Sequence, residues 1–107
     1  MYHAWRDGHL DPHDRMGTFA EGLATRVPFA LTAGVLRKKL DDFVLVPDRE
    51  IREAMAWFLE HERLAVEGAC AATLAGLRSL DDVAGRNVVL PLSGRNVAPE
   101  KLRATLE

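Results

Sequence analysis

Apolar side chains recur at helical spacing most clearly in residues 48–63. Four of them share one face of a helix drawn through this segment: Ile51, Met55, Phe58 and Leu59. Asp48 stands at the start, where its carboxylate could accept hydrogen bonds from the free N–H groups of the first turn. The pattern therefore predicts a helix over residues 48–63 with Asp48 as its N-cap and one buried face.

Four further segments favour helices. Residues 30–41 carry a second apolar stripe, made of Leu31, Val35, Leu36 and Leu40. Residues 68–79 are rich in alanine, so a helix there can lie close to its neighbours. A short helix is expected over residues 2–8, ended by Gly8. A last helix opens at Pro99, where the missing N–H of proline costs nothing.

Two short apolar runs, residues 43–46 and 87–92, have the character of buried strands. Strands that alternate with helices predict an α/β fold with parallel strands. We therefore expect a partial three-layer arrangement in which a few parallel strands are flanked by helices. Two strands are fewer than a stable sheet usually needs, so either the N-terminal part supplies another strand or, as we expect, the two belong to a larger sheet. Residues 9–17 are polar and contain a proline, which makes residues 1–17 the part expected to be least ordered.

The composition is that of a soluble globular protein, and 107 residues suffice for a single segment spanning 1–107 but not for two domains. A net charge of -2 gives no electrostatic reason to expect nucleic acid or an anionic membrane as a partner. No apolar run approaches the ~20 residues that span a bilayer, and the first residues lack the apolar core of a signal peptide. The single cysteine, Cys70, excludes a disulfide within the chain and favours a reducing, cytoplasmic location. It is expected to be a small packed residue.

A zinc site near the start of the chain is conceivable, but a polar loop is the better interpretation, and a serine nucleophile lacks its partners. Three of the four histidines lie near the start among aspartates, but their spacing matches no zinc-ligand pattern. Ser93 follows an apolar run, yet Pro91 and Arg95 replace the glycines of a Gly-x-Ser-x-Gly elbow. Because no histidine follows His61, a serine-hydrolase mechanism is excluded.

Ser93 has another interpretation, because a polar residue directly after a buried strand sits at the carboxyl edge of a sheet. Ligands bind at that edge in open α/β folds. Gly94 would permit close backbone approach, and the Asn96 side chain could hold the loop through bonds to the backbone. The same residues could equally form an ordinary connection between a strand and a helix.

Glu67 stands at the start of an otherwise apolar helix. It could simply satisfy the positive end of the helix dipole, or its carboxylate could point into a site. Glu21 and Gly22 pose the same question in a weaker form.

Three segments together resemble the pyridoxal-phosphate (PLP) dependent threonine and serine dehydratases. Residues 18–24 (Thr-Phe-Ala-Glu-Gly-Leu-Ala) resemble a Thr-x-Ala-Asp/Glu-Gly-x-Ala segment of that family. Residues 66–72 (Val-Glu-Gly-Ala-Cys-Ala-Ala) resemble its Glu-Gly-Ala-Gly-Ala-Ala segment. Residues 88–96 resemble its apolar strand followed by Ser-Gly-Gly-Asn. The order and spacing of the three are also those of the family, and the similarity covers nearly the whole chain.

The resemblance implies the C-terminal part of a fold-type-II PLP enzyme, related to tryptophan synthase β. It implies β-elimination of water from a small amino acid, threonine or serine, giving a 2-oxo acid and ammonia. By the resemblance, Ser93 would bond the pyridine nitrogen of PLP, with Gly94 and Asn96 beside it. Gly22 and Glu67 would lie near the cofactor ring or the substrate.

The chain also departs from the family pattern. It contains neither the segment with the Schiff-base lysine nor the Gly-rich phosphate loop, so no residue of this chain is expected to be catalytic. Arg95 replaces the second glycine beside Ser93, and Cys70 replaces a glycine.

Three alternatives follow for the whole chain. It could complete a dehydratase whose remainder comes from a longer chain or another subunit, with a homo-oligomer expected. It could be a non-catalytic remnant or interaction module that keeps the scaffold, or an unrelated small α/β binding domain.

Overall fold

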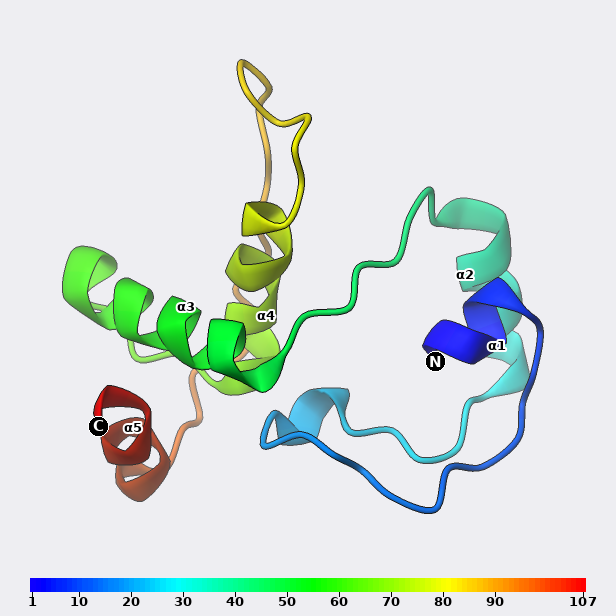
Figure 1. The fold of residues 1–107 in the computed structure, drawn as a ribbon, viewed down its shortest axis with the longest axis horizontal. Coiled ribbons are helices and arrows are strands. Elements are labelled where there is room, and N and C mark those ends of the chain that lie inside the picture. The colour runs from blue at the N-terminus through cyan, green and yellow to red at the C-terminus, as the bar shows by residue number, and fades with distance from the viewer.

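The computed structural model describes residues 1–107 and is built from helices alone (Figure 1). In chain order they are α1 (Tyr2–Arg6), the 3-10 helix η1 (Glu21–Leu23), α2 (Ala30–Lys39), α3 (Asp48–Glu62), α4 (Gly68–Arg78) and α5 (Pro99–Leu106). The five α-helices lie within one or two residues of the ranges expected from the apolar pattern. Pro99 opens α5, and Gly8 adopts the left-handed conformation (φ 78°) two residues beyond α1.

The predicted α/β fold is wrong, because the chain forms no β-strand and no sheet. Residues 43–46 and 87–92 are irregular, and none of their backbone groups hydrogen-bonds to another backbone group. Val46 and Leu90 pack against the core, which explains the apolar character of both runs. A strand needs a neighbour to pair with, and this chain places no extended segment beside either run. The apolar character of a run alone therefore does not show that the run is a strand.

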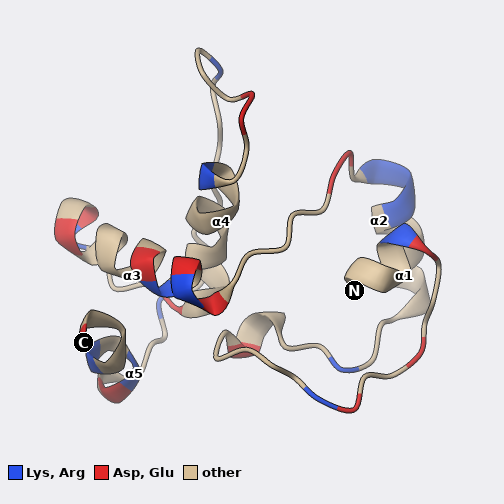
Figure 2. Ribbon diagram, in the orientation of Figure 1, with Lys and Arg blue, Asp and Glu red and all other residues tan.

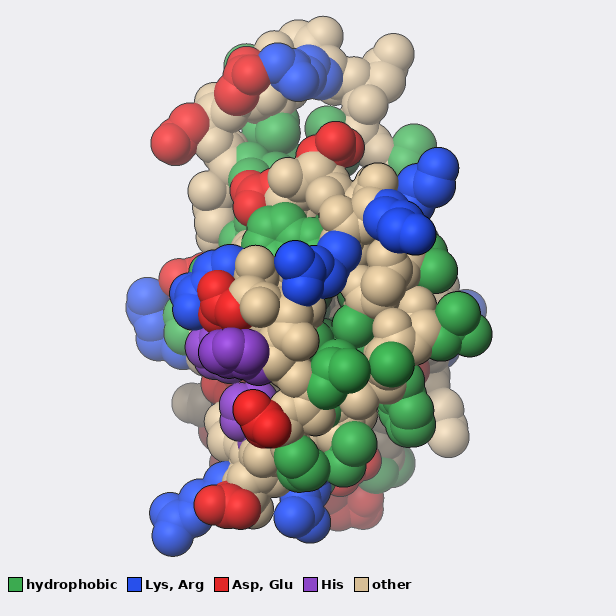
Figure 3. Space-filling model, turned by 90° about the vertical axis from the view of Figure 1, so that its right-hand side faces the viewer, with side chains coloured by type: hydrophobic (Ala, Val, Ile, Leu, Met, Phe, Trp, Pro, Cys, Tyr) green, Lys and Arg blue, Asp and Glu red, His purple; other side chains and the backbone are tan.

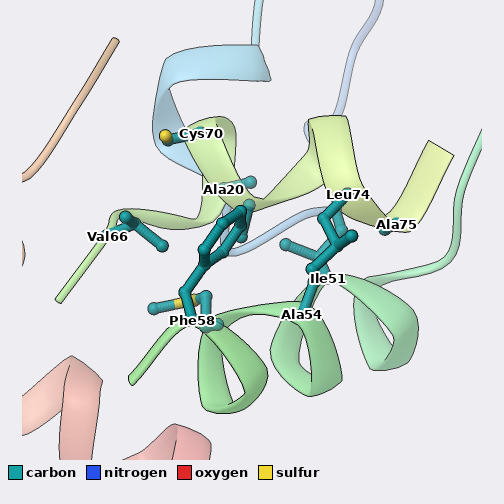
Figure 4. Close-up of a cluster of buried hydrophobic side chains, with 10 residues drawn as sticks. Ala20, Ile51, Ala54, Phe58, Val66, Cys70, Leu74 and Ala75 are labelled. Carbon is teal, nitrogen blue, oxygen red and sulfur yellow. The ribbon is translucent and has the colours of Figure 1, made fainter. Parts of the chain in front are cut away.

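The core lies between α3 and α4 and is closed by the segment before η1 (Figure 4). It comprises 10 buried residues: Ala20, Ile51, Ala54, Met55, Phe58, Val66, Cys70, Ala71, Leu74 and Ala75. Figure 4 shows Phe58 directed from α3 toward α4. The small side chains of α4 let the two helices approach closely, as its alanine content predicts. Cys70 is 1% exposed and unpaired, which confirms it as a small packed residue.

The start of α3 differs from the prediction in one respect. Pro47 occupies the N-cap position, and Asp48 is already helical and makes no capping bond. Its carboxylate instead accepts hydrogen bonds from Thr18 Oγ1 (2.5 Å) and from the backbone N–H of Phe19 (3.0 Å). Asp48 thus ties the segment before η1 to α3.

Helices α1 and α2 contact each other and touch none of the other helices (Figure 1). The apolar stripe predicted for α2 exists but is not buried: Leu31 is 83% exposed and Val35 is 52% exposed. Figure 3 shows hydrophobic side chains gathered at the surface of the face that it views. The radius of gyration is 14.8 Å, against about 13 Å for a compact chain of this length. The α1–α2 part is therefore an outlying arm rather than a second layer on the core.

Charged side chains of both signs are spread over the whole molecule, with a basic block at the end of α2 (Figure 2). No helix combines the length and the apolar character needed to cross a membrane.

Candidate functional site

A cleft of about 230 Å³ lies where η1, the start of α4 and the start of α5 meet beside α3. Eleven residues line it: Phe19, Glu21, Gly22, Met55, Glu67, Gly68, Ala69, Asn96, Val97, Ala98 and Lys101. Gly22, Glu67 and Asn96 are three of the five residues singled out in the sequence. They lie far apart along the chain, and folding brings them to one cavity.

The η1 wall is positioned by Phe19, which lies between α3 and α4. Arg52 of α3 places its guanidinium 4.0 Å from the centre of the Phe19 ring. On the other side, a β-carbon at Gly68 would come within 2.9 Å of Phe19 and 3.2 Å of Ala20. Only a glycine at position 68 therefore lets this segment pack against α4. Together with the Asp48 anchor, these contacts fix Glu21 and Gly22 at the edge of the cleft.

Gly22 faces the start of α4 at close range. A β-carbon there would lie 2.8 Å from the β-carbon of Ala69. The missing side chain of Gly22 therefore lets η1 pack closely against α4, and the two residues together form one wall of the cleft.

Glu67 is the N-cap residue of α4, but its carboxylate makes no capping bond. The side chain is half-buried, and its oxygens take part in no hydrogen bond or ion pair within the chain. This arrangement favours the second interpretation of Glu67, in which the carboxylate is directed into a site instead of serving the helix terminus.

Gly94 joins the turn at residues 93–96 to α4. Its carbonyl accepts a hydrogen bond from the backbone N–H of Glu67 (3.2 Å). A β-carbon at position 94 would overlap the Glu67 carboxylate and lie 2.8 Å from its Cγ. Gly94 therefore decides where the Glu67 side chain can lie, and its influence on the cleft is indirect.

Asn96 lines the cleft, whereas Ser93 is exposed and is not among the lining residues. The expected hydrogen bond between the Ser93 hydroxyl and the pyridine nitrogen of the cofactor stays a prediction.

Sequence reasoning missed Lys101, which reaches the cleft from the first turn of α5. Its Nζ lies 2.6 Å from Glu21 Oε1. The only signal in the sequence is a lysine two residues after Pro99, which says nothing about what it faces. The contact depends on how α5 leans on α3, and that is a property of the folded chain.

No three His, Cys, Asp or Glu side chains gather around one point. The two groups with displaced pKa values, Arg6 and Asp7, stand at the end of α1 and do not line the cleft. The Arg6 guanidinium hydrogen-bonds the Asp7 carboxylate (2.7 Å) and lowers the pKa of that carboxyl below its usual value. The same contact raises the pKa of Arg6.

Residues 1–94 match the family model described as "Pyridoxal-phosphate dependent enzyme". The chain is similar to an L-threonine ammonia-lyase of Thermotoga maritima, with 32% identity over 97 residues that cover 91% of this chain and 24% of the relative. It is 34% identical to the catabolic L-threonine dehydratase TdcB of Escherichia coli K12, over 91% of this chain and 30% of that protein. An L-threonine ammonia-lyase of Geobacter sulfurreducens is 37% identical over 84% of this chain and 23% of its own length. The chain thus spans between 23% and 30% of the length of these curated relatives.

The cleft fits part of the cofactor that the family name gives. Gly22 and Ala69 give the cleft a wall with little side chain, and the Asn96 amide offers both a donor and an acceptor. The unpartnered Glu67 carboxylate offers further acceptors. The cavity is slightly smaller than the range of about 300–1,000 Å³ typical of ligand pockets, so it suits a portion of the group and not the whole of it. The family match over most of the chain decides the assignment: this chain belongs to the pyridoxal-phosphate dependent enzymes.

Proposed function

We propose that the chain is the C-terminal cofactor-side segment of a PLP-dependent dehydratase acting on threonine or serine. The net reaction removes water by β-elimination and releases a 2-oxo acid and ammonia. Residues 1–107 act as one segment in this proposal, and the remainder of the enzyme comes from further chain or from another subunit. Three names support the substrate class, since the relatives in Thermotoga, Escherichia and Geobacter are threonine ammonia-lyases or dehydratases.

The convergence of Gly22, Glu67 and Asn96 on one cleft carries the proposal. Each belongs to a different segment that resembles the dehydratases. A chance resemblance would give no reason for the three segments to meet at one cavity.

Bound PLP withdraws electrons from the α-carbon of an amino acid, which is the chemistry that elimination needs. The residues of this chain would orient and tune that group. The Asn96 amide would hydrogen-bond a polar atom of the ligand, and Glu67 would accept from a donor on it. The Gly22–Ala69 wall would limit the depth of the cleft. Ser93 would contribute its hydroxyl after a small movement of the exposed turn at residues 93–96.

Incompleteness of the site supports the further proposal that the chain alone is inactive. Lys101 is the lysine nearest the cleft, and it is engaged by Glu21. The exposed apolar face of α2 and the unpaired segments at 43–46 and 87–92 suit burial against another part of the same enzyme or another copy of the chain. A cytoplasmic location is part of the same proposal.

A non-catalytic interaction module is the second candidate, and the same exposed surfaces favour it. Under that function the cleft would be a by-product of the scaffold, and changes in it would leave partner binding intact.

A chimera separates the two candidates. Residues 1–107 would replace the aligned segment of the Escherichia coli dehydratase, which is 30% of that protein, and the rest of the dehydratase would supply the remainder of the enzyme. We expect the chimera to bind PLP and to form 2-oxobutanoate from threonine, while the 107-residue chain by itself forms none. A folded chimera without PLP binding would contradict the dehydratase proposal, and 2-oxobutanoate from the chain alone would contradict its inactivity.

A further inference from the structure

Lys101 is the single cationic side chain among the residues that line the cleft. The other two charged residues, Glu21 and Glu67, are carboxylates. Any negatively charged group that enters the cleft must therefore find its counter-charge at Lys101. The residue lies outside the 1–94 match, so family membership gives it no role.

The partner of Lys101 is already a carboxylate. Its Nζ lies 2.6 Å from Glu21 Oε1, which is hydrogen-bonding distance for an ammonium and a carboxylate oxygen. A carboxylate on a ligand could use the same position. The contact with Glu21 thus shows that the Lys101 ammonium can bind a carboxylate at the mouth of the cleft.

This ion pair is easily exchanged. The Glu21 side chain is 79% exposed and that of Lys101 is 48% exposed, so water competes for both charges. An exposed pair of this kind has little net stability, and a ligand anion needs only a modest advantage to displace Glu21.

The backbone of Lys101 is held in place while its side chain stays free to change partner. Helix α5 contacts α3, and Thr105 Oγ1 lies 3.9 Å from Met55 Sδ. The same hydroxyl donates to the carbonyl of Lys101 (2.9 Å). Helix α5 therefore positions Lys101 at the cleft, because the helix packs against α3 and contacts Met55 of the core.

We propose that Lys101 is the anion-binding residue of the cleft and that Glu21 is its internal competitor. In the free chain Lys101 and Glu21 pair with each other at the edge of the cleft that both residues line. When a small ligand carrying a carboxylate or a phosphate enters, the ammonium binds that group and releases Glu21. This inference rests on the proposed function insofar as the cleft is taken to be the ligand site, but it requires no dehydratase activity.

The test is anion titration of the 107-residue chain in the absence of PLP. Sodium acetate, L-threonine and inorganic phosphate are added separately at constant ionic strength, and the backbone amide shifts of Gly22, Asn96 and Lys101 are followed by NMR. Saturable shifts with acetate and threonine identify a carboxylate site, whereas shifts with phosphate alone identify a phosphate site.

Two substitutions of the pair act in opposite directions. Lys101→Met keeps the length of the side chain and removes the charge, so the saturable shifts should disappear, while Lys101→Arg should retain them. Glu21→Gln removes the competitor and should tighten binding about two- to fivefold, the range that an exposed ion pair allows.

Matched controls exclude a general charge effect. Lys39→Met removes a lysine from α2, and Glu100→Gln removes a carboxylate from the same turn of α5 without freeing Lys101. Both should bind anions as the unsubstituted chain does. The proposal is overturned if Lys101→Met binds as well as the original chain, or if Glu100→Gln tightens binding as much as Glu21→Gln. An inactive chimera with intact anion binding would remove the dehydratase proposal alone.

Discussion

Helices α3 and α4 form one pair, helices α1 and α2 form another, and the two pairs differ in what stabilises them. The first pair encloses the 10 buried residues of the core and closes against η1 and α5. The second pair buries only Ala4 and Ala33 within its helices and leaves large apolar side chains of α2 in water. The three residues that converge on the cleft lie in segments beside the first pair: Gly22 in η1, Glu67 just before α4 and Asn96 shortly before α5. The candidate site therefore lies beside the packed core, and the outlying arm carries surface that another molecule or segment could cover.

The largest test of this contrast is a pair of truncations, one in each part. Phe58→Ala empties the middle of the core and should lower the free energy of unfolding by about 3–5 kcal/mol. Leu31→Ala on α2 should change it by less than about 0.5 kcal/mol, because that side chain is 83% exposed. Urea unfolding followed by circular dichroism measures both. Similar losses for the two variants would mean that α2 is buried in solution.

Asp48→Ala is expected to have the next largest effect. It removes a charged acceptor from Thr18 Oγ1 and from the Phe19 N–H, so we expect a loss of about 1.5–3 kcal/mol in the free energy of unfolding. Amide exchange at residues 18–23 should accelerate as the η1 wall loosens. Asp41→Ala, an exposed aspartate outside both helix pairs, is the control. Equal effects of the two would show that the anchor contributes nothing.

Two glycines of α4 sharpen the account of the cleft. Gly68→Ala would force a β-carbon against Phe19 and Ala20, with an expected cost of about 1–3 kcal/mol. At Gly76 in the same helix a β-carbon meets no atom within 4 Å, so Gly76→Ala should stabilise the chain by about 0.5–1 kcal/mol. Thermal melting of both variants decides the point. A Gly68→Ala chain as stable as Gly76→Ala would mean that the 19–20 segment does not rest on α4.

The smallest effect concerns the outlying arm. Because Arg6 lowers the pKa of Asp7 in the folded chain, Asp7 stabilises α1 when the pH is above about 4, its ordinary unfolded value. That contribution is lost as the pH falls through the lower, folded value. Asp7→Asn should therefore reduce the melting temperature slightly at pH 7 and progressively less as the pH falls below 4. A difference that grows on acidification would contradict this sign.

The elements differ in how far the sequence could anticipate them. The helix with Ile51, Met55 and Phe58 was predictable because its stripe meets a partner only a few residues further on, in α4. The irregular conformation of residues 43–46 was not predictable, because an apolar segment becomes a strand only when another strand lies beside it. Asp48 looked like an N-cap, since its true partners, Thr18 and Phe19, lie about thirty residues away. Glu67, Asn96 and, more weakly, Gly22 could be singled out from their positions in the sequence, and the resemblance then joined them in one site. Lys101 could not be found because its role depends on how α5 docks.

Cofactor affinity in the chimera tests the central claim, that the cleft of Gly22, Glu67 and Asn96 is the PLP side of an enzyme. Asn96→Ala removes an amide that lines the cleft, whereas Asn87→Ala removes an exposed amide outside it. We predict that Asn96→Ala weakens PLP binding about two- to tenfold, the value of one hydrogen bond, and that Asn87→Ala leaves the dissociation constant unchanged. Equal dissociation constants for the two variants, measured by the visible absorbance of bound PLP, would contradict the account.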